Sequence, residues 1–337
     1  MISFEDIAFV ILLILVFLSL RKNDQEDFLN TKNANQLRGI FALLIIIFHI
    51  AKDDDLIFPI FDYFAITVVA AFFFVSGFGL MKGYINKPNY HVGYLKKRFV
   101  KVLLPYIIMT LVYWAYRTFI GEHYSLYDVW HMAISYGPIV MYSWFLISLF
   151  VQYFYFYVLI FICRNKKNIL LSIVLFLILI DLFLAVFYNY GNASYFNYMF
   201  GLGIIYANYE TQINQFINKN KIVLAIVAIS LIFLTQYFRS SIPITNELFL
   251  FIKKVLFVFG CLVFMSFFKF ENEILNVCGN LSMEIYMTQG ISKMIIRRFL
   301  GFTIQIQDFF IFVLTFILSF CFHKLFQYLS KTILHEK

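Results

Sequence analysis

Charged residues are scarce in this sequence. Asp, Glu, Lys and Arg together make up only 14% of its 337 residues, whereas 62% are hydrophobic. A soluble domain has no interior large enough to bury so much apolar side-chain surface. The composition therefore excludes a soluble globular protein, and repeated long apolar runs indicate a membrane protein with several transmembrane segments.

Cysteine is also scarce, and basic residues outnumber acidic ones. The four cysteines stand singly along the chain, at Cys163, Cys261, Cys278 and Cys321. Their spacing fits no zinc site and no disulfide framework, so we interpret them as apolar core residues and expect no bound metal. The net charge of +8 would suggest nucleic-acid binding in a soluble protein. In a membrane protein such basic residues mark cytoplasmic loops, so we expect no nucleic-acid partner.

The sequence shows no linker and no internal repeat, and we expect no cleavable leader. Glu5 and Asp6 precede the first apolar run, where a signal peptide carries basic residues, and no small-residue cleavage site follows. No Ser- or Pro-rich stretch divides the chain. We therefore expect one membrane domain at residues 35–337, with residues 1–34 as an additional N-terminal transmembrane helix and loop.

Apolar runs recur along the whole chain. They lie at 5–20, 36–51, 62–81, 99–119, 138–163, 168–188, 193–209, 221–238, 250–269, 274–292 and 306–330. A helix of about 20 apolar residues crosses a bilayer, so the pattern predicts an all-α polytopic transmembrane bundle of about eleven helices. About ten would form the main domain and one the N-terminal addition. The signal is weakest at 193–209 and 274–292.

The distribution of Lys and Arg predicts the orientation of the bundle. If the N-terminus is outside and the C-terminus inside, most of the 27 Lys and Arg residues fall in inner loops, as the positive-inside rule requires. Two basic clusters do not fit this orientation, because they fall on the outer side: Lys253 with Lys254, and Lys293 with Arg297 and Arg298. They either contact an acidic glycan or lipid, or show that a helix boundary is misplaced.

The run NQLRGIFALLIIIFHI, residues 35–50, places two ionisable side chains in an apolar helix. Arg38 and His49 are eleven residues apart, so they share one helix face and lie ~16 Å apart along the axis. In the expected orientation Arg38 is at the cytoplasmic end and His49 is in the outer half of the membrane. Ionisable groups there usually face a bundle interior or a wet cavity. From the residues alone, His49 is either functional or a packing or interfacial histidine.

Five motifs in the right order resemble the acyltransferase-3 family, integral membrane enzymes that acylate bacterial surface glycans. The Arg38–Gly39…His49 helix resembles the first core helix of that family, and FFFVSGFGL (72–80) resembles its second. YLKKRFVKVLLPY, WFLISLFVQY and LSMEIYMTQ, which begin at Tyr94, Trp144 and Leu281, resemble three further family segments. The resemblance covers roughly residues 35–330.

The chain departs from the family pattern in places. Asn35 stands where many members have Asp, which removes an acidic partner for Arg38. Lys101 replaces the second Arg of a basic pair and loses the bidentate fork. Gln289 replaces a late His, so a two-histidine mechanism is excluded at those positions, and Met283 replaces a Tyr.

The resemblance implies a membrane O-acetyltransferase of the cytoplasmic membrane. Its donor would be cytosolic acetyl-CoA or another acyl-CoA, and its acceptor a hydroxyl of an extracytoplasmic polysaccharide, such as capsule or exopolysaccharide. Membrane lipid and polysaccharide biosynthesis proteins are the further expected partners. The alternatives are a transporter or flippase, or a non-catalytic component of a polysaccharide export system.

The resemblance also implies roles for individual residues. His49 would act as general base or accept the acyl group transiently, and Arg38 would face the donor or pair with Glu284. The inner cluster of Lys97, Arg98 and Lys101 would bind the donor phosphates; without the resemblance, it is a topology and lipid-headgroup signal. Residues expected to support the site or contact the acceptor are Ser76, Trp144, Glu284, Tyr286 and Gln289. No motif surrounds His323, which we interpret as a packing residue.

Overall fold

The computed structural model describes residues 3–51, 61–134, 139–163, 167–188, 198–238 and 247–335, and nearly all of them are helical. The helices are α1 Phe4–Ser19, α2 Thr31–Ala51, α3 Phe61–Asn86, α4 Tyr94–Arg98, the π-helical turn η1 Phe99–Leu103, α5 Leu104–Phe119, α6 Leu126–Ile134, α7 Trp144–Cys163, α8 Lys167–Tyr188, α9 Tyr198–Asn208, α10 Glu210–Tyr237, α11 Glu247–Phe267, α12 Glu273–Asn280, α13 Ser282–Phe299 and α14 Ile304–Leu334. The strands are β1 Leu20–Lys22 and β2 Phe268–Phe270.

The all-α, polytopic architecture expected from the apolar runs is confirmed. Backbone polar groups in a bilayer must be satisfied within the segment, and a helix does this for any apolar sequence. Seven helical segments in the described part of the chain are long and apolar enough to cross a membrane. They are Thr31–Ala51, Thr67–Asn86, Tyr94–Phe119, Trp144–Cys163, Glu210–Thr235, Phe249–Phe267 and Ile304–Leu334.

The two weakest runs differ most from simple spans. In the described part of the 193–209 run, which begins at residue 198, the helix is the 11-residue α9. The 274–292 run is divided between α12 and α13, with the break at Leu281. The short helix α6 and the two strands were not expected from the sequence.

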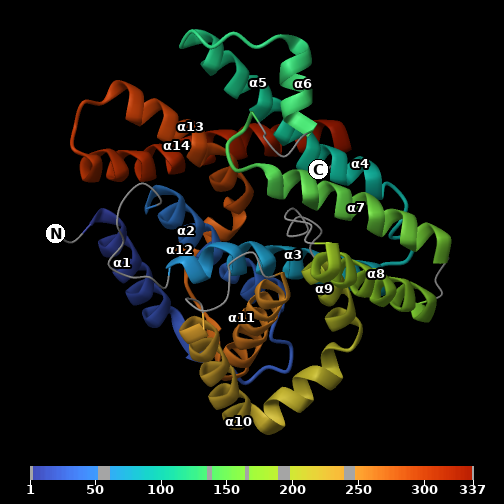
Figure 1. The fold of residues 1–337 in the computed structure, drawn as a ribbon. Coiled ribbons are helices and arrows are strands. Elements are labelled where there is room, and N and C mark those ends of the chain that lie inside the picture. Colours follow the sequence, from blue (N-terminus) through green and yellow to red (C-terminus); the bar gives the residue numbers. More distant parts are fainter. Residues whose placement is uncertain are drawn as a thin grey trace.

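Helix α2 packs against α1, α3, α12 and α13, and its Phe41 ring also contacts Phe257 of α11 (Figure 1). In its most apolar window, 78% of the α2 residues are buried, against 11% in α10. The central helix therefore holds its polar side chains inside the protein, whereas α10 presents its apolar side chains outward.

Two helix crossings are close enough to require glycine. A Cβ on Gly39 would lie 2.1 Å from the Leu275 carbonyl oxygen, and one on Gly279 would lie 1.9 Å from the Asn35 carbonyl oxygen. The crossing of α2 and α12 thus depends on both residues. Small residues at such crossings let transmembrane backbones approach closely.

Helices α3 and α9 also cross closely, with a glycine of each helix against the backbone of the other. A Cβ on Gly77 would lie 2.0 Å from the Phe200 carbonyl oxygen, and one on Gly203 would lie 2.1 Å from the Phe74 carbonyl oxygen. Gly77 therefore lets α3 and α9 approach closely. Gly79 has no such role, because a Cβ there would meet nothing within 4 Å.

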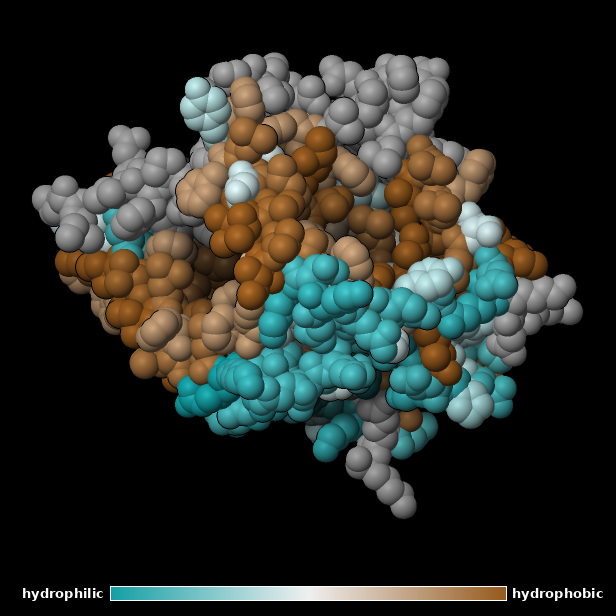
Figure 2. Space-filling model, turned by 90° about the horizontal axis from the view of Figure 1, so that it is seen from below, coloured by the Kyte–Doolittle hydropathy of each residue, from teal (hydrophilic) through white to brown (hydrophobic). Residues whose placement is uncertain are grey.

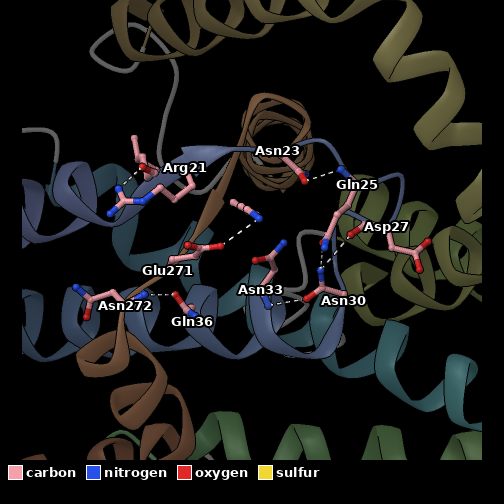
Figure 3. A network of polar contacts seen from close by, with 11 residues as sticks. Arg21, Asn23, Gln25, Asp27, Asn30, Asn33, Gln36, Glu271 and Asn272 are labelled. Atoms are coloured by element: carbon pink, nitrogen blue, oxygen red, sulfur yellow. Dashed lines mark hydrogen bonds and ion pairs between the residues drawn. The ribbon is translucent and has the colours of Figure 1, made fainter.

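A polar network anchors the beginning of α2 (Figure 3). Strand β1 pairs antiparallel with β2, which joins the end of α1 to the end of α11. The Asn30 side chain donates to Gln25 Oε1 at 2.7 Å and accepts from the Asn33 backbone N–H at 3.0 Å. One helical turn further on, Gln36 Oε1 accepts from the Asn272 backbone N–H at 3.1 Å. These contacts fix α2 relative to α12.

The surface agrees with a bilayer location. Figure 2 shows a broad hydrophobic surface that borders a hydrophilic one on the same face of the molecule. Large apolar side chains of α10 are exposed, among them Ile222, Ile226 and Phe233. Hydrophobic surface of this extent is stable only against lipid or another apolar partner.

Candidate active site

Helix α2 carries two polar centres on one uninterrupted helix. Arg38 and His49 both lie within Thr31–Ala51, so their separation along the axis is ~16 Å, as expected from the sequence. The chain around α7 meets α2 at both places. Tyr142, just before α7, stacks on His49, and Tyr153, within α7, lies near Arg38. The α7 segment therefore runs antiparallel to α2 with a matching spacing.

The His49 centre is built from aromatic rings. The imidazole stacks on the ring of Tyr142, with centroids 3.8 Å apart and planes within 9°. The Tyr286 ring lies 6.4 Å from the imidazole, and its hydroxyl donates to the Tyr142 carbonyl oxygen. Lys293 Nζ donates to the His49 carbonyl oxygen at 2.9 Å. The half-buried imidazole is thus held in one plane by a neighbouring ring.

Tyr142 adopts an unfavourable backbone conformation where it stacks on His49. Its φ of 67° lies in the left-handed region, which a bulky residue other than glycine rarely adopts. Strain of this kind costs about 1–3 kcal/mol and persists where the surroundings determine the conformation. Here the hydrogen bond from Tyr286 and the stacked imidazole fix Tyr142. The strained residue aims its ring at the one histidine of α2.

The Arg38 centre is oriented by an amide in place of a carboxylate. Arg38 Nη2 donates to Asn35 Oδ1 at 2.9 Å. The Asn35 amide nitrogen in turn donates to the Asn276 carbonyl oxygen at 2.9 Å and to Asn280 Oδ1 at 2.9 Å, both on α12. Asn35 therefore compensates geometrically for the missing Asp, and it leaves the positive charge of Arg38 unneutralised.

Arg98 is separated from the lysines with which the sequence groups it. Its guanidinium carbon lies 5.2 Å from the Tyr94 ring centroid and 5.0 Å from that of Tyr153. Nη2 also donates to Tyr90 Oη at 3.2 Å. Lys97 and Lys101 are exposed, whereas Arg98 is half-buried. Lys97 is the preceding residue of α4 and so lies about 100° away around the helix, and Lys101 lies in the π-helical turn η1 that begins directly after Arg98.

The two arginines converge on Tyr153. The ring centroid of this buried tyrosine lies 5.0 Å from the Arg98 guanidinium carbon, and its side chain lies near Arg38. Neither Arg38 nor Arg98 forms an ion pair with a carboxylate of the described residues. Sequence reasoning missed Tyr153, although it is the last residue of the quoted WFLISLFVQY segment.

Four of the other expected site residues have different surroundings. Tyr286 contacts the His49 centre as described, and Gln289 is buried one turn further along α13. Gln289 Nε2 donates to the Tyr286 carbonyl oxygen at 3.1 Å, so it supports that turn and not the imidazole. Ser76 is half-buried next to Gly77, and Trp144 is half-buried at the first turn of α7.

Glu284 has a partner other than Arg38. Its Oε1 lies 2.9 Å from His323 Nδ1, and Gln327 lies 2.8 Å from the other ring nitrogen of that histidine. The pair joins α13 to α14. His323 therefore links two helices through hydrogen bonds, and the alternative of an Arg38–Glu284 ion pair is not present.

The basic residues that do not fit the predicted positive-inside pattern mostly make contacts inside the protein. Arg297 pairs with the fully buried Asp308 at 2.5 Å. Lys253 and Lys254 are both buried, and the ammonium group of Lys254 lies 5.4 Å from the Tyr198 ring centroid. These side chains therefore have structural contacts in the described part of the chain.

No group of three or more His, Cys, Asp or Glu in the described ranges could hold a metal ion. The two centres on α2 consist instead of cationic, phenolic and imidazole groups. Such groups can bind an anion at one end and accept a proton at the other.

Comparison with known proteins identifies the family. No curated protein and no solved structure matches the chain significantly. The acyltransferase-3 family, described as an acyltransferase domain, matches residues 32–324. This range includes both centres on α2 together with α3, α7, α13 and most of α14. The chain therefore belongs to the acyltransferase-3 family and is a multi-pass membrane acyltransferase.

Proposed function

We propose that the protein transfers an acetyl group from cytosolic acetyl-CoA to a hydroxyl group of an extracytoplasmic polysaccharide, such as capsule or exopolysaccharide. The observation that supports this most strongly is the arrangement of α2. One buried helix joins a two-arginine centre to a histidine centre ~16 Å away, a separation that spans about half of the ~30 Å hydrocarbon core. A donor bound at one end would present its thioester toward the other.

The donor end contains Arg38 and Arg98, with Lys97 and Lys101 at its exposed side. Guanidinium groups bind phosphate through paired, charge-assisted hydrogen bonds, and exposed lysines raise the local concentration of anions. Acetyl-CoA carries its phosphates at the end opposite to the thioester. The arginines would therefore hold the phosphates, and the pantetheine arm would extend along α2.

The acceptor end contains His49. In direct transfer, the acceptor oxygen attacks the thioester carbonyl carbon while His49 accepts the hydroxyl proton. The carbon–sulfur bond then breaks, the ester forms, and the proton passes from the imidazolium to the departing thiolate to give CoA. In the alternative, His49 carries the acetyl group between donor and acceptor. Stacking on Tyr142 orients the imidazole for either route.

The proposal places the protein in the cytoplasmic membrane with the N-terminus outside and the C-terminus inside. Arg98 and its neighbouring lysines then face the cytosol, where acyl-CoA is available. His49 lies toward the outside, where the glycan is presented.

A labelling experiment tests the function. Inverted membrane vesicles that contain the protein and the polysaccharide receive acetyl-labelled acetyl-CoA from the side that was cytosolic. We expect alkali-labile label on enclosed glycan with the wild type and none with His49→Ala. A transporter or an export component would leave the glycan unlabelled in both samples, and that result would reject the proposal.

A further inference from the structure

We infer that the Tyr153 hydroxyl, together with Arg38 and Arg98, forms one binding centre for a phosphate ester, in which Tyr153 donates a hydrogen bond to the bound phosphate. The inference rests on the proposed function, because it assigns that phosphate to the diphosphate of acyl-CoA. It adds a side chain from α7 to a donor site otherwise made from α2 and α4.

The first observation is how firmly Arg98 is held. Its guanidinium group lies against the rings of Tyr94 and Tyr153 and donates one hydrogen bond to Tyr90. Aromatic rings stabilise the flat face of a guanidinium group and leave its edge available for hydrogen bonding. Arg98 is thus pre-oriented for a ligand without being neutralised.

The second observation concerns hydrogen-bond donors without acceptors. The Nε atoms of Arg38 and Arg98 are both buried, and neither has a hydrogen-bond partner among the described residues. Tyr153 is 8% exposed, and its ring lies against the Arg98 guanidinium group. A buried charged donor without an acceptor costs free energy, so two of them beside one phenol indicate an acceptor that comes from a ligand.

The third observation is the charge of the centre. It holds two guanidinium groups. Phenol side chains surround that of Arg98, and the Asn35 amide contacts that of Arg38. Such a centre favours a ligand with more than one negative charge. A neutral phenol suits the third position because it donates a hydrogen bond without neutralising the arginines. A diphosphate has both the charge and enough oxygen atoms to accept from all three side chains.

The test measures CoA binding to the full-length protein in nanodiscs of neutral lipid, by titration calorimetry. Tyr153→Phe keeps the ring against Arg98 and removes only the hydroxyl. We expect it to weaken CoA binding about tenfold to a hundredfold, the effect of losing one hydrogen bond to a charged group. The matched control is Tyr157→Phe, one turn further along α7, where the ring stacks on Tyr94. We expect no change there.

A second ligand separates positioning of the phosphate from general packing. S-acetylpantetheine has the thioester but no phosphate, so wild type and Tyr153→Phe should bind it equally. In steady-state assays with acetyl-CoA, Tyr153→Phe should raise KM and leave kcat at saturation nearly unchanged. Equal losses with both ligands, or equal CoA binding by wild type and Tyr153→Phe, would overturn the inference and leave the acetyltransferase proposal standing.

Anionic lipid is the other source of a phosphate ester. The same titration in nanodiscs containing phosphatidylglycerol shows whether lipid competes with CoA. If CoA does not bind to wild type even in neutral lipid, while Tyr153→Phe loses affinity for phosphatidylglycerol, the centre holds a headgroup. That outcome would overturn both the CoA assignment and the proposed donor.

Discussion

At the scale of single residues, the site depends on polar groups whose surroundings are apolar or aromatic. His49 is half-buried between Phe48, Tyr142 and Tyr286. A general base needs a ring nitrogen held in a fixed direction toward the proton that it accepts. The aromatic surroundings therefore suit the base role that we propose, and the stacked ring limits the imidazole to one plane.

We expect His49→Ala to abolish acyl transfer without lowering the amount of inserted protein. Loss of a general base commonly costs about 10²–10⁴-fold in rate. Initial rates with labelled acetyl-CoA, normalised to protein in the membrane, measure the effect. His91→Ala is the control, since His91 is an exposed histidine on the turn before α4. A His49→Ala variant with nearly normal rate would show that His49 only packs.

Arg38 offers a graded test. We expect Arg38→Ala to lower kcat/KM for acetyl-CoA nearly as much as the loss of His49 does, and Arg38→Lys to restore part of it. Lysine keeps the charge but has no planar fork for Asn35 and phosphate. Steady-state kinetics over a range of acetyl-CoA concentrations measure this. Full rescue by lysine would mean that charge alone matters.

The sequence identified the two site residues that share α2, but it did not identify the side chains from the α7 segment that lie beside them. Arg38 and His49 are related by helical periodicity, which the sequence shows directly. Tyr142 and Tyr153 reach them through the packing of the α7 segment about a hundred positions later, which no local pattern reveals. The left-handed backbone of Tyr142 also has no glycine or asparagine to mark it.

At the scale of elements, apolar runs predicted the helices because lipid removes every alternative backbone partner. Counting apolar residues over a long window missed the break at Leu281, although Gly279 and Asn280 before it and Ser282 after it are residues typical of helix ends. They also missed α6, which is short and has both polar and apolar side chains. The pairing of β1 with β2 involves three residues on each side, too few for an alternating pattern.

The close crossing of α3 and α9 can be tested with two glycine substitutions in α3, one at the crossing and one away from it. We expect Gly77→Ala to destabilise the protein, because its Cβ would overlap the Phe200 carbonyl oxygen and force α3 from α9. Overpacking of this kind costs about 1–3 kcal/mol. Gly79→Ala, two residues along, meets open space and should cause no loss. Thermal unfolding in detergent compares them; equal Tm values would mean that α9 can shift freely.

At the scale of the whole molecule, function depends on which end of the bundle faces the cytosol. Acyl-CoA is a cytosolic metabolite that does not cross a bilayer, so a donor centre on the outer side would have no substrate. The charge pattern of the sequence places the end that carries Lys82, Lys87 and Lys97 inside. The orientation of one span fixes the orientation of all the others, so labelling the two ends of one span tests this prediction.

The segment Tyr94–Phe119 joins two exposed sites at its opposite ends. Asn86 precedes it and His123 follows it. In a variant without the four native cysteines, we expect Asn86→Cys to resist a membrane-impermeant thiol reagent applied to spheroplasts, and His123→Cys to react. Both should react after the membrane is permeabilised, which controls for accessibility. The opposite pattern would place Arg98 and its lysines outside the cell. In that case the two-arginine centre could not bind a cytosolic donor, and the proposed direction of acetyl transfer along α2 would be wrong even if His49 proved essential.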